Sequence, residues 1–296
     1  MGKASRRKRQ AAQQGTGTQA APAAARAPFV ARPFEGLAGE TEWVALREIV
    51  PAGTAPVTMR LPEGEREVLL VSVLPGAVPA LHRADGALLV ALQSRTSSGD
   101  ASRDVVHAVE EVARLEPGQP LASVRPATAD TARLQDVLAE GQELRVEVHQ
   151  DFGFWVADEE AAAELAEVLE RTNEAAVPTE RVDTVPSAFW TTMSGRSYLR
   201  WLLPDDEDTA VRALARLQAA GTHTLGEDTK LLGMFRAAGL IVPVLEVPAD
   251  AEPQAYAEAL GELAARYEEV KGDDTPLTPE ERRARDSLSS RQVSLR

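Results

Sequence analysis

The spacing of apolar residues in the first half of the chain changes from strand-like to helical and back. An apolar run predicts a buried strand, and two short apolar segments around the turn pair Asp85-Gly86 predict a hairpin. Apolar residues three and four positions apart then predict two helices, the second ending at Gly141. We expect the buried strand over residues 67–74, the hairpin over 78–93 and the two helices over 100–115 and 130–140. Alternating apolar and polar residues predict a half-buried strand over 144–148.

The second half of the chain shows the same order of patterns. A hairpin is expected around Ser194-Gly195, followed by a helix, a second helix that ends at Gly239, and a strand. Each half is closed by a helix with an acidic outer face and an Ala/Leu inner face. In the second half, the hairpin is expected over residues 188–203, the two helices over 208–220 and 229–238, and the strand over 240–247. The two closing helices are expected over 158–173 and 253–270.

The two halves can also be aligned with each other. Residues 130–174 overlay residues 228–272 without a gap, at an offset of 98 positions. Identical pairs include Asp130/Asp228, Gly141/Gly239 and Leu165/Leu263. We therefore expect an α+β fold of two tandem pseudo-repeats, each hairpin–helix–helix–strand–helix, with a groove between the copies.

Composition shifts suggest where the units begin and end. Residues 1–34 form a basic tail too poor in apolar residues to fold, so we expect disorder there. The first repeat is assigned to residues 35–157 and the second to residues 158–271. Residues 272–296 are a linker and a C-terminal helix, which has few apolar residues and needs a docking surface to be stable.

Charge is unevenly distributed between the tail and the rest of the chain. The tail carries +7 and no acid, so the remainder carries −21, seven below the −14 of the whole chain. An acidic body repels nucleic acid, and only the tail attracts polyanions. The tail is interpreted either as a contact to RNA or DNA or as a solubilising segment, and its candidate polyanion-binding residues are Lys3, Arg6, Arg7, Lys8 and Arg9.

Several classes of function are excluded or disfavoured by what the sequence lacks. There is no cysteine, so thiol catalysis and thiolate metal sites are excluded. The chain contains no phosphate-binding loop, no dinucleotide fingerprint and no zinc-protease motif, so no cofactor is expected. It also has no apolar run long enough to span a membrane and no secretory signal, which favours a cytoplasmic protein without membrane insertion.

The best candidate for chemistry is an alternating trio of polar residues. Glu147, His149 and Asp151 would share one face of an extended strand, where an imidazole and two carboxylates suit a divalent metal. The alternative is the solvent-facing edge of an antiparallel strand, for which such alternation is normal. The trio would serve one copy only, because Leu245, Val247 and Ala249 occupy the equivalent positions.

Three stretches of the chain resemble a bacterial family of unknown function found in actinobacteria: residues 29–59 (FVARPFEGLAGETEWVALREIVPAGTAPVTM), 98–105 (SGDASRDV) and 188–221 (AFWTTMSGRSYLRWLLPDDEDTAVRALARLQAAG). The resemblance spans nearly everything after the tail, and it implies no activity. Similar proteins sometimes bear names of a topoisomerase or a preprotein translocase subunit. Neither name fits, because the phosphate loop of a translocase ATPase is missing and the tyrosines lie in an acidic body.

The sequence therefore favours a binding or regulatory protein over an enzyme. We expect a protein partner in the groove between the repeats, with the basic tail as an auxiliary contact to RNA or DNA. The alternatives are a small metal-dependent enzyme centred on Glu147, His149 and Asp151, and a ribosome- or nucleic-acid-associated factor that acts through the tail.

Overall fold

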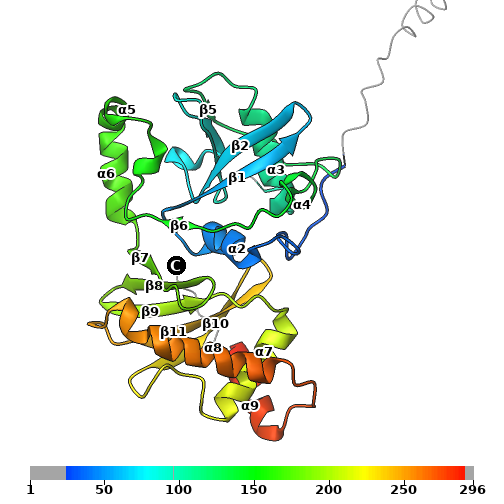
Figure 1. Ribbon diagram of the computed structural model, residues 1–296, viewed down its shortest axis with the longest axis vertical. Coiled ribbons are helices and arrows are strands. Elements are labelled where there is room, and N and C mark those ends of the chain that lie inside the picture. The colour runs from blue at the N-terminus through cyan, green and yellow to red at the C-terminus, as the bar shows by residue number, and fades with distance from the viewer. Residues whose placement is uncertain (1–24, 96, 291–296) are drawn as a thin grey trace, which may run out of the picture.

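The computed structural model describes residues 25–95 and 97–290, which fold into two lobes stacked along the long axis of the molecule (Figure 1). The first lobe, residues 25–178, is built on a six-stranded sheet, and the second lobe, residues 179–290, on a five-stranded sheet. Helix α2 (Glu40–Glu48) lies at the waist between the two sheets (Figure 1). The expected α+β class is confirmed. No helix in the described ranges is long and apolar enough to cross a membrane.

The first sheet has the strand order β5-β3-β4-β2-β1-β6 and is mixed. β1 pairs antiparallel with β2 over its whole length, whereas β2 pairs parallel with β4. The expected hairpin around Asp85-Gly86 is present as β3 and β4. The strands and turns are β1 (Gly53–Leu61), β2 (Gly64–Val71), η1 (Pro75–Ala77), β3 (Ala80–His82), β4 (Leu88–Ala91), β5 (Pro120–Leu121), β6 (Glu147–Val148) and η2 (Gly153–Trp155).

Both faces of the first sheet are covered by apolar side chains. One face packs against α3 (Ala101–Val112), whose valines at positions 105, 106, 109 and 112 are buried, and against the short α4 (Leu134–Val137). The other face packs against Phe152 and Trp155, and α6 (Ala166–Ala175) covers these two side chains. A short helix, α5 (Glu159–Glu164), comes directly before α6 in the chain. The helix expected over 158–173 is therefore present as two segments, and it packs with the first lobe.

The second sheet has the strand order β10-β11-β9-β8-β7, and its neighbouring strands are antiparallel. Its strands are β7 (Thr179–Arg181), β8 (Ala188–Met193), β9 (Arg196–Trp201), β10 (Lys230–Ala237) and β11 (Leu240–Val247). One face is covered by α7 (Glu207–Ala219) and α8 (Ala257–Lys271), which follows η3 (Pro253–Tyr256). The opposite face is directed toward α2 and the first lobe.

Helix α2 is buried on all sides, because both lobes pack against it. Its residues 41–46 are all buried, which the sequence pattern of a surface helix would not allow. Trp43 and Leu46 belong to the same apolar cluster as Phe189, Leu202 and other residues of the second sheet. One continuous core therefore runs through the waist and closes most of the expected groove between the halves.

The elements with strong local signals match the sequence prediction. Asp100 caps α3, and its side chain accepts a hydrogen bond from the backbone N–H of Ser102 at 3.1 Å. The hairpin around Ser194-Gly195 forms β8 and β9, and the expected strand 240–247 is β11. Each lobe thus contains a hairpin followed by a helix, β3–β4–α3 in the first and β8–β9–α7 in the second.

The proposed register between the halves is not confirmed. Residues 229–238 were expected to be helical and instead form strand β10, so that part of the prediction is wrong. The residues Ala238 and Gly239 both have positive φ values, 42° and 89°, and make a tight hairpin turn to β11 rather than a helix end. In the first lobe only residues 134–137 of the expected helix 130–140 are helical, and Leu138 bridges to Met59 in extended geometry.

The C-terminal helix α9 (Pro279–Ser290) docks on the second lobe, as its composition required. Thr278 and Glu281 form a capping box at its start, in which each backbone N–H donates to the other's side chain at 2.7 and 3.2 Å. The buried side chains Ala284 and Leu288 attach the helix to the lobe. The few apolar residues of α9 are therefore enough to place it.

Candidate functional site

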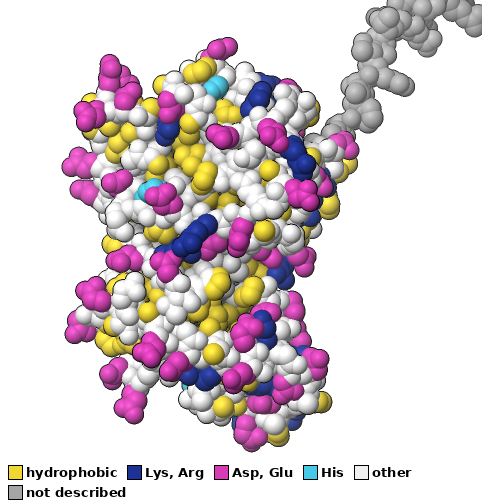
Figure 2. All heavy atoms as spheres, in the orientation of Figure 1, with side chains coloured by type: hydrophobic (Ala, Val, Ile, Leu, Met, Phe, Trp, Pro, Cys, Tyr) yellow, Lys and Arg dark blue, Asp and Glu magenta, His cyan; other side chains and the backbone are white. Residues whose placement is uncertain are grey.

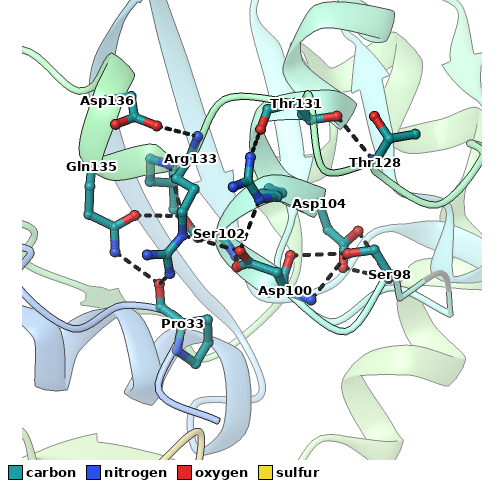
Figure 3. Close-up of polar contacts among 12 residues, drawn as sticks. Pro33, Ser98, Asp100, Ser102, Asp104, Thr128, Thr131, Arg133, Gln135 and Asp136 are labelled. Atoms are coloured by element: carbon teal, nitrogen blue, oxygen red, sulfur yellow. Dashed lines mark hydrogen bonds and ion pairs between the residues drawn. The ribbon is translucent and has the colours of Figure 1, made fainter. Parts of the chain in front are cut away.

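A dense polar network surrounds the stretch 98–105 at the start of α3 (Figure 3). Asp100 is 1% exposed, and its carboxylate lies 3.3 Å from Nε of Arg103 and 3.1 Å from Nε of Arg133. Asp104 accepts two hydrogen bonds from the backbone N–H of Ser98, at 3.1 and 3.0 Å. The Asp100 carboxylate is thus the shared counter-ion of two guanidinium groups, and its other oxygen caps α3.

The same network attaches the segment before α2 to the first lobe. Arg133 and Gln135 both donate to the carbonyl oxygen of Pro33, at 2.8 and 3.0 Å (Figure 3). Gln135 also donates to the carbonyl of Glu35. Ser102 joins α3 to α4, because its hydroxyl accepts from the backbone N–H of Leu134 at 2.8 Å. The network therefore positions the chain that leads into α2.

A second polar cluster joins the two lobes at the waist. Glu42 of α2 accepts two hydrogen bonds from the guanidinium of Arg181 on β7, at 2.9 and 2.5 Å. The hydroxyl of Ser187 donates to the same carboxylate at 2.5 Å, and the backbone N–H of Val146 donates at 2.9 Å. Glu42 and Arg181 side chains are only 9% and 14% exposed, so this is a buried, fully hydrogen-bonded ion pair.

The surroundings of Glu42 keep it ionised. Burial alone would raise the pKa of its carboxyl group, but the hydrogen bonds from Arg181, Ser187 and the Val146 backbone, together with the charge of Arg181, outweigh burial and hold the pKa below its ordinary value. The cluster is therefore charged at neutral pH. A carboxylate held in this way accepts hydrogen bonds and is poorly suited to act as a general acid.

An inter-lobe cleft opens beside this cluster and consists of two adjoining hollows of about 360 and 500 Å³. Its walls are residues 39–42, 143–150 and 56 of the first lobe and 179–186 of the second. Figure 2 shows basic atoms at the waist between the lobes with acidic atoms beside them. The exposed charges that line the cleft are mainly acidic: one arginine, Arg145, against the carboxylates of Glu143, Glu147, Glu180 and Asp183.

A family model, that of a family of unknown function (DUF5926), matches residues 33–296. The chain belongs to this family. No curated protein and no solved structure shows significant similarity to the chain. The matched region starts at Pro33 and includes both polar clusters and the cleft.

The proposed metal ligands lie on one segment, and each has another contact or faces solvent. Glu147 is exposed on β6, and Nε2 of His149 lies 2.8 Å from the hydroxyl of Thr54. The strand ends at Val148, so Asp151 leaves the expected line and accepts from the backbone N–H of Gly153. Within residues 25–95 and 97–290, no group of three His, Asp or Glu side chains is arranged to hold a metal ion.

The other sequence candidates divide into described and undescribed residues. The polyanion-binding candidates Lys3, Arg6, Arg7, Lys8 and Arg9 lie outside the described residues. Sequence reasoning missed Glu42, Arg181 and Ser187, because no local pattern links residues almost 140 positions apart. The one available signal is Glu42 itself, a charged residue directly before the apolar run 43–46.

Proposed function

We propose that the protein is a non-enzymatic binding protein whose inter-lobe cleft takes an extended segment of a partner protein. The observation that supports this most directly is that both sheets end at the cleft. Strand β6 is the last strand of the first sheet and β7 is the last strand of the second, and residues of both line the larger hollow. An unpaired sheet edge is a template for an added strand.

The geometry of β6 leaves one edge directed into the cleft. The backbone N–H of His149 donates to the carbonyl of Ala52, next to β1. Because backbone groups alternate in direction along a strand, the N–H and C=O groups of Val146 and Val148 point away from β1. The backbone N–H of Val146 already donates to Glu42, and its carbonyl already accepts from Arg181. Strand addition therefore starts at Val148 and continues toward Gln150, next to β7.

The charge of the cleft favours a basic partner segment. Arg181 is neutralised by Glu42, and the exposed Arg145 forms an ion pair with Asp183 at 3.2 Å. Glu147 and Glu180 remain on the two strand edges and face solvent. Basic side chains on an added strand would pair with these carboxylates, while its backbone would supply the hydrogen bonds.

The test is selection of peptides from a random displayed library on the full-length protein, followed by mapping of the bound peptide by hydrogen exchange. We expect basic, extended peptides that protect backbone amides near residues 148–150 and 179–181. The double variant Glu147→Lys/Glu180→Lys should weaken their binding at least about tenfold.

The matched control is Glu65→Lys, which reverses an exposed carboxylate on β2 away from the cleft and should leave binding within about twofold. Protection that maps outside the cleft, or equal affinities for the cleft variant and the control, would reject the proposed binding mode.

A further inference from the structure

The inter-lobe cleft carries negative charge that nothing in the described part of the chain compensates. The exposed carboxylates of Glu143, Glu147 and Glu180 line its walls, and none of them forms an ion pair with a residue in 25–95 or 97–290. Arg145 and Asp183 pair with each other and so add no net charge. The like charges repel one another, and an occupant rich in cations would relieve that repulsion.

One stretch of the same chain has the complementary charge. Residues 3–9 (KASRRKR) hold five cations and no acid, and they lie outside the described residues. They include no proline and no glycine, so each backbone N–H of the stretch can pair with a sheet edge. The exposed arginines of α9 differ, because Arg283 and Arg285 each pair with a carboxylate of their own helix.

The chain before the described part is long enough to reach the cleft. Ala25 precedes Gly39, which lines the cleft, by 14 residues, so the two lie at most about 50 Å apart. Arg9 precedes Ala25 by 16 residues, which span up to about 55 Å. Most of residues 25–39 are partly or fully exposed, so this segment follows the surface to the cleft. A stretch that returns beside it brings residues 3–9 to the same place.

We propose that residues 3–9 of the same chain occupy the cleft and exclude a partner until the partner displaces them. The inference rests on the proposed function, since it takes the cleft to bind a basic, extended segment. The tail backbone would extend the first sheet beside Val148, and its cations would pair with Glu147 and Glu180. A tether of about 15 residues gives an effective concentration of about a millimolar, which weakens partner binding in proportion.

Crosslinking tests where the tail lies. The sequence has no cysteine, so Ser5→Cys gives one site for a photo-crosslinker and leaves the five cations in place. We expect crosslinks within one chain to residues 143–150 and 179–183. They should disappear in Glu147→Lys/Glu180→Lys and persist in the control Glu65→Lys. Crosslinks elsewhere, only between two chains, unchanged in the cleft variant or absent from the native chain would overturn the proposal.

Competition tests whether the tail restricts the cleft. The probe is a labelled peptide with the sequence of residues 1–12, and its binding to the full-length protein is followed by fluorescence anisotropy. In the tail variant, the competitor is removed without shortening the chain by changing five residues to Gln: Lys3, Arg6, Arg7, Lys8 and Arg9. We expect this variant to bind the peptide at least about fivefold more tightly than the native chain.

The matched control loses the same charge at exposed positions outside the cleft. Its five changes to Gln are at Arg66, Arg114, Arg125, Arg283 and Arg285. It should bind the peptide within about twofold of the native chain. A gain equal to that of the tail variant would assign the effect to net charge and reject the proposal.

The two proposals fail in different ways. Equal peptide affinities for the tail variant and the native chain, with hydrogen exchange still placing the peptide in the cleft, would reject occupancy by the tail and leave the proposed function standing. No peptide binding at the cleft of the tail variant, where the competitor is gone, would reject both.

Discussion

Arg181 on the edge strand of the second sheet donates to both carboxylate oxygens of Glu42 on the helix at the waist, at 2.9 and 2.5 Å. This two-armed ion pair is the main polar connection between the lobes, and it forms one wall of the inter-lobe cleft. Its geometry ties the two sheets to one relative placement, because any rotation between the lobes would separate these atoms.

Removing either member of this pair should destabilise the protein strongly. Arg181→Met leaves Glu42 buried without its counter-ion, and we expect a loss of about 3–5 kcal/mol in the free energy of unfolding. Glu42→Gln should cost a similar amount, and the double variant less than the sum of the two. Urea unfolding at neutral pH measures these values from the midpoint and slope.

The matched control is Arg145→Met, which removes another ion pair between the lobes. Arg145 and Asp183 side chains are 78% and 66% exposed, so the loss should be at most about 1 kcal/mol. Equal costs for the buried and exposed pairs would show that burial does not determine their contribution.

Acid should weaken the contact between the lobes through Glu42. The pKa of this carboxyl is below its ordinary value of 4.5 in the folded protein, so the unfolded chain binds a proton more readily. The stabilisation is fully present above that ordinary pKa and is lost as the pH falls through the folded value. Unfolding curves at pH values between 2 and 7 should show a steeper acid loss for the native protein than for Glu42→Gln. Parallel curves would mean that the group's pKa is not lowered.

Asp100 should be the most sensitive position of the network at the start of α3. Asp100→Asn keeps the helix cap but leaves Arg103 and Arg133 without their shared counter-ion, and we expect a loss of about 3 kcal/mol. Asp100→Ala also loses the cap, at about 1 kcal/mol more. Asp206→Ala is the control, since Asp206 is an exposed cap of α7 and should cost only about 1 kcal/mol. Calorimetry measures the loss in the free energy of unfolding for each variant. Equal losses for Asp100→Ala and Asp206→Ala would show that the two arginines contribute nothing.

Arg216 of α7 should determine whether α9 stays docked. This buried residue donates to backbone carbonyls of residues 270, 273 and 275 and forms an ion pair with Glu281. Arg216→Met removes these contacts, so amides of α9 should exchange at least about tenfold faster. Arg285→Met, an exposed change on α9 itself, should leave the exchange rates nearly unchanged. Hydrogen exchange with mass spectrometry resolves the two cases.

The sequence predicted elements whose signals are local. The helix that begins after Asp100, the turn at Ser194-Gly195 and the strand 240–247 each depend on a few neighbouring residues. Strand β10 was misread because Leu231, Leu232 and Phe235 have helical spacing, while Gly233 and the Ala238-Gly239 turn favour a bulged strand and a hairpin. The similarity between the two halves likewise extends to the order of a hairpin and a helix and not to the residues that follow.

The candidate sites could not be predicted from local sequence patterns. The partners of Glu42 are more than 100 residues away in sequence. The trio Glu147, His149 and Asp151 has a clear local pattern, but its expected common face requires an extended chain. Strand β6 ends at Val148, before two of the three residues. Long-range contacts and strand ends are properties of the folded chain that no local pattern records.

The burial of α2 from both sides has a consequence for the order of events on the ribosome. Trp43 is synthesised early, while Val242, which belongs to the same apolar cluster, follows roughly 200 residues later. At about 5–20 residues per second, one side of the helix is left uncovered for roughly 10–40 s. During that interval the apolar side chains of α2 that pack on the second sheet lack their partners, so we expect the growing chain to be a chaperone substrate until that sheet emerges.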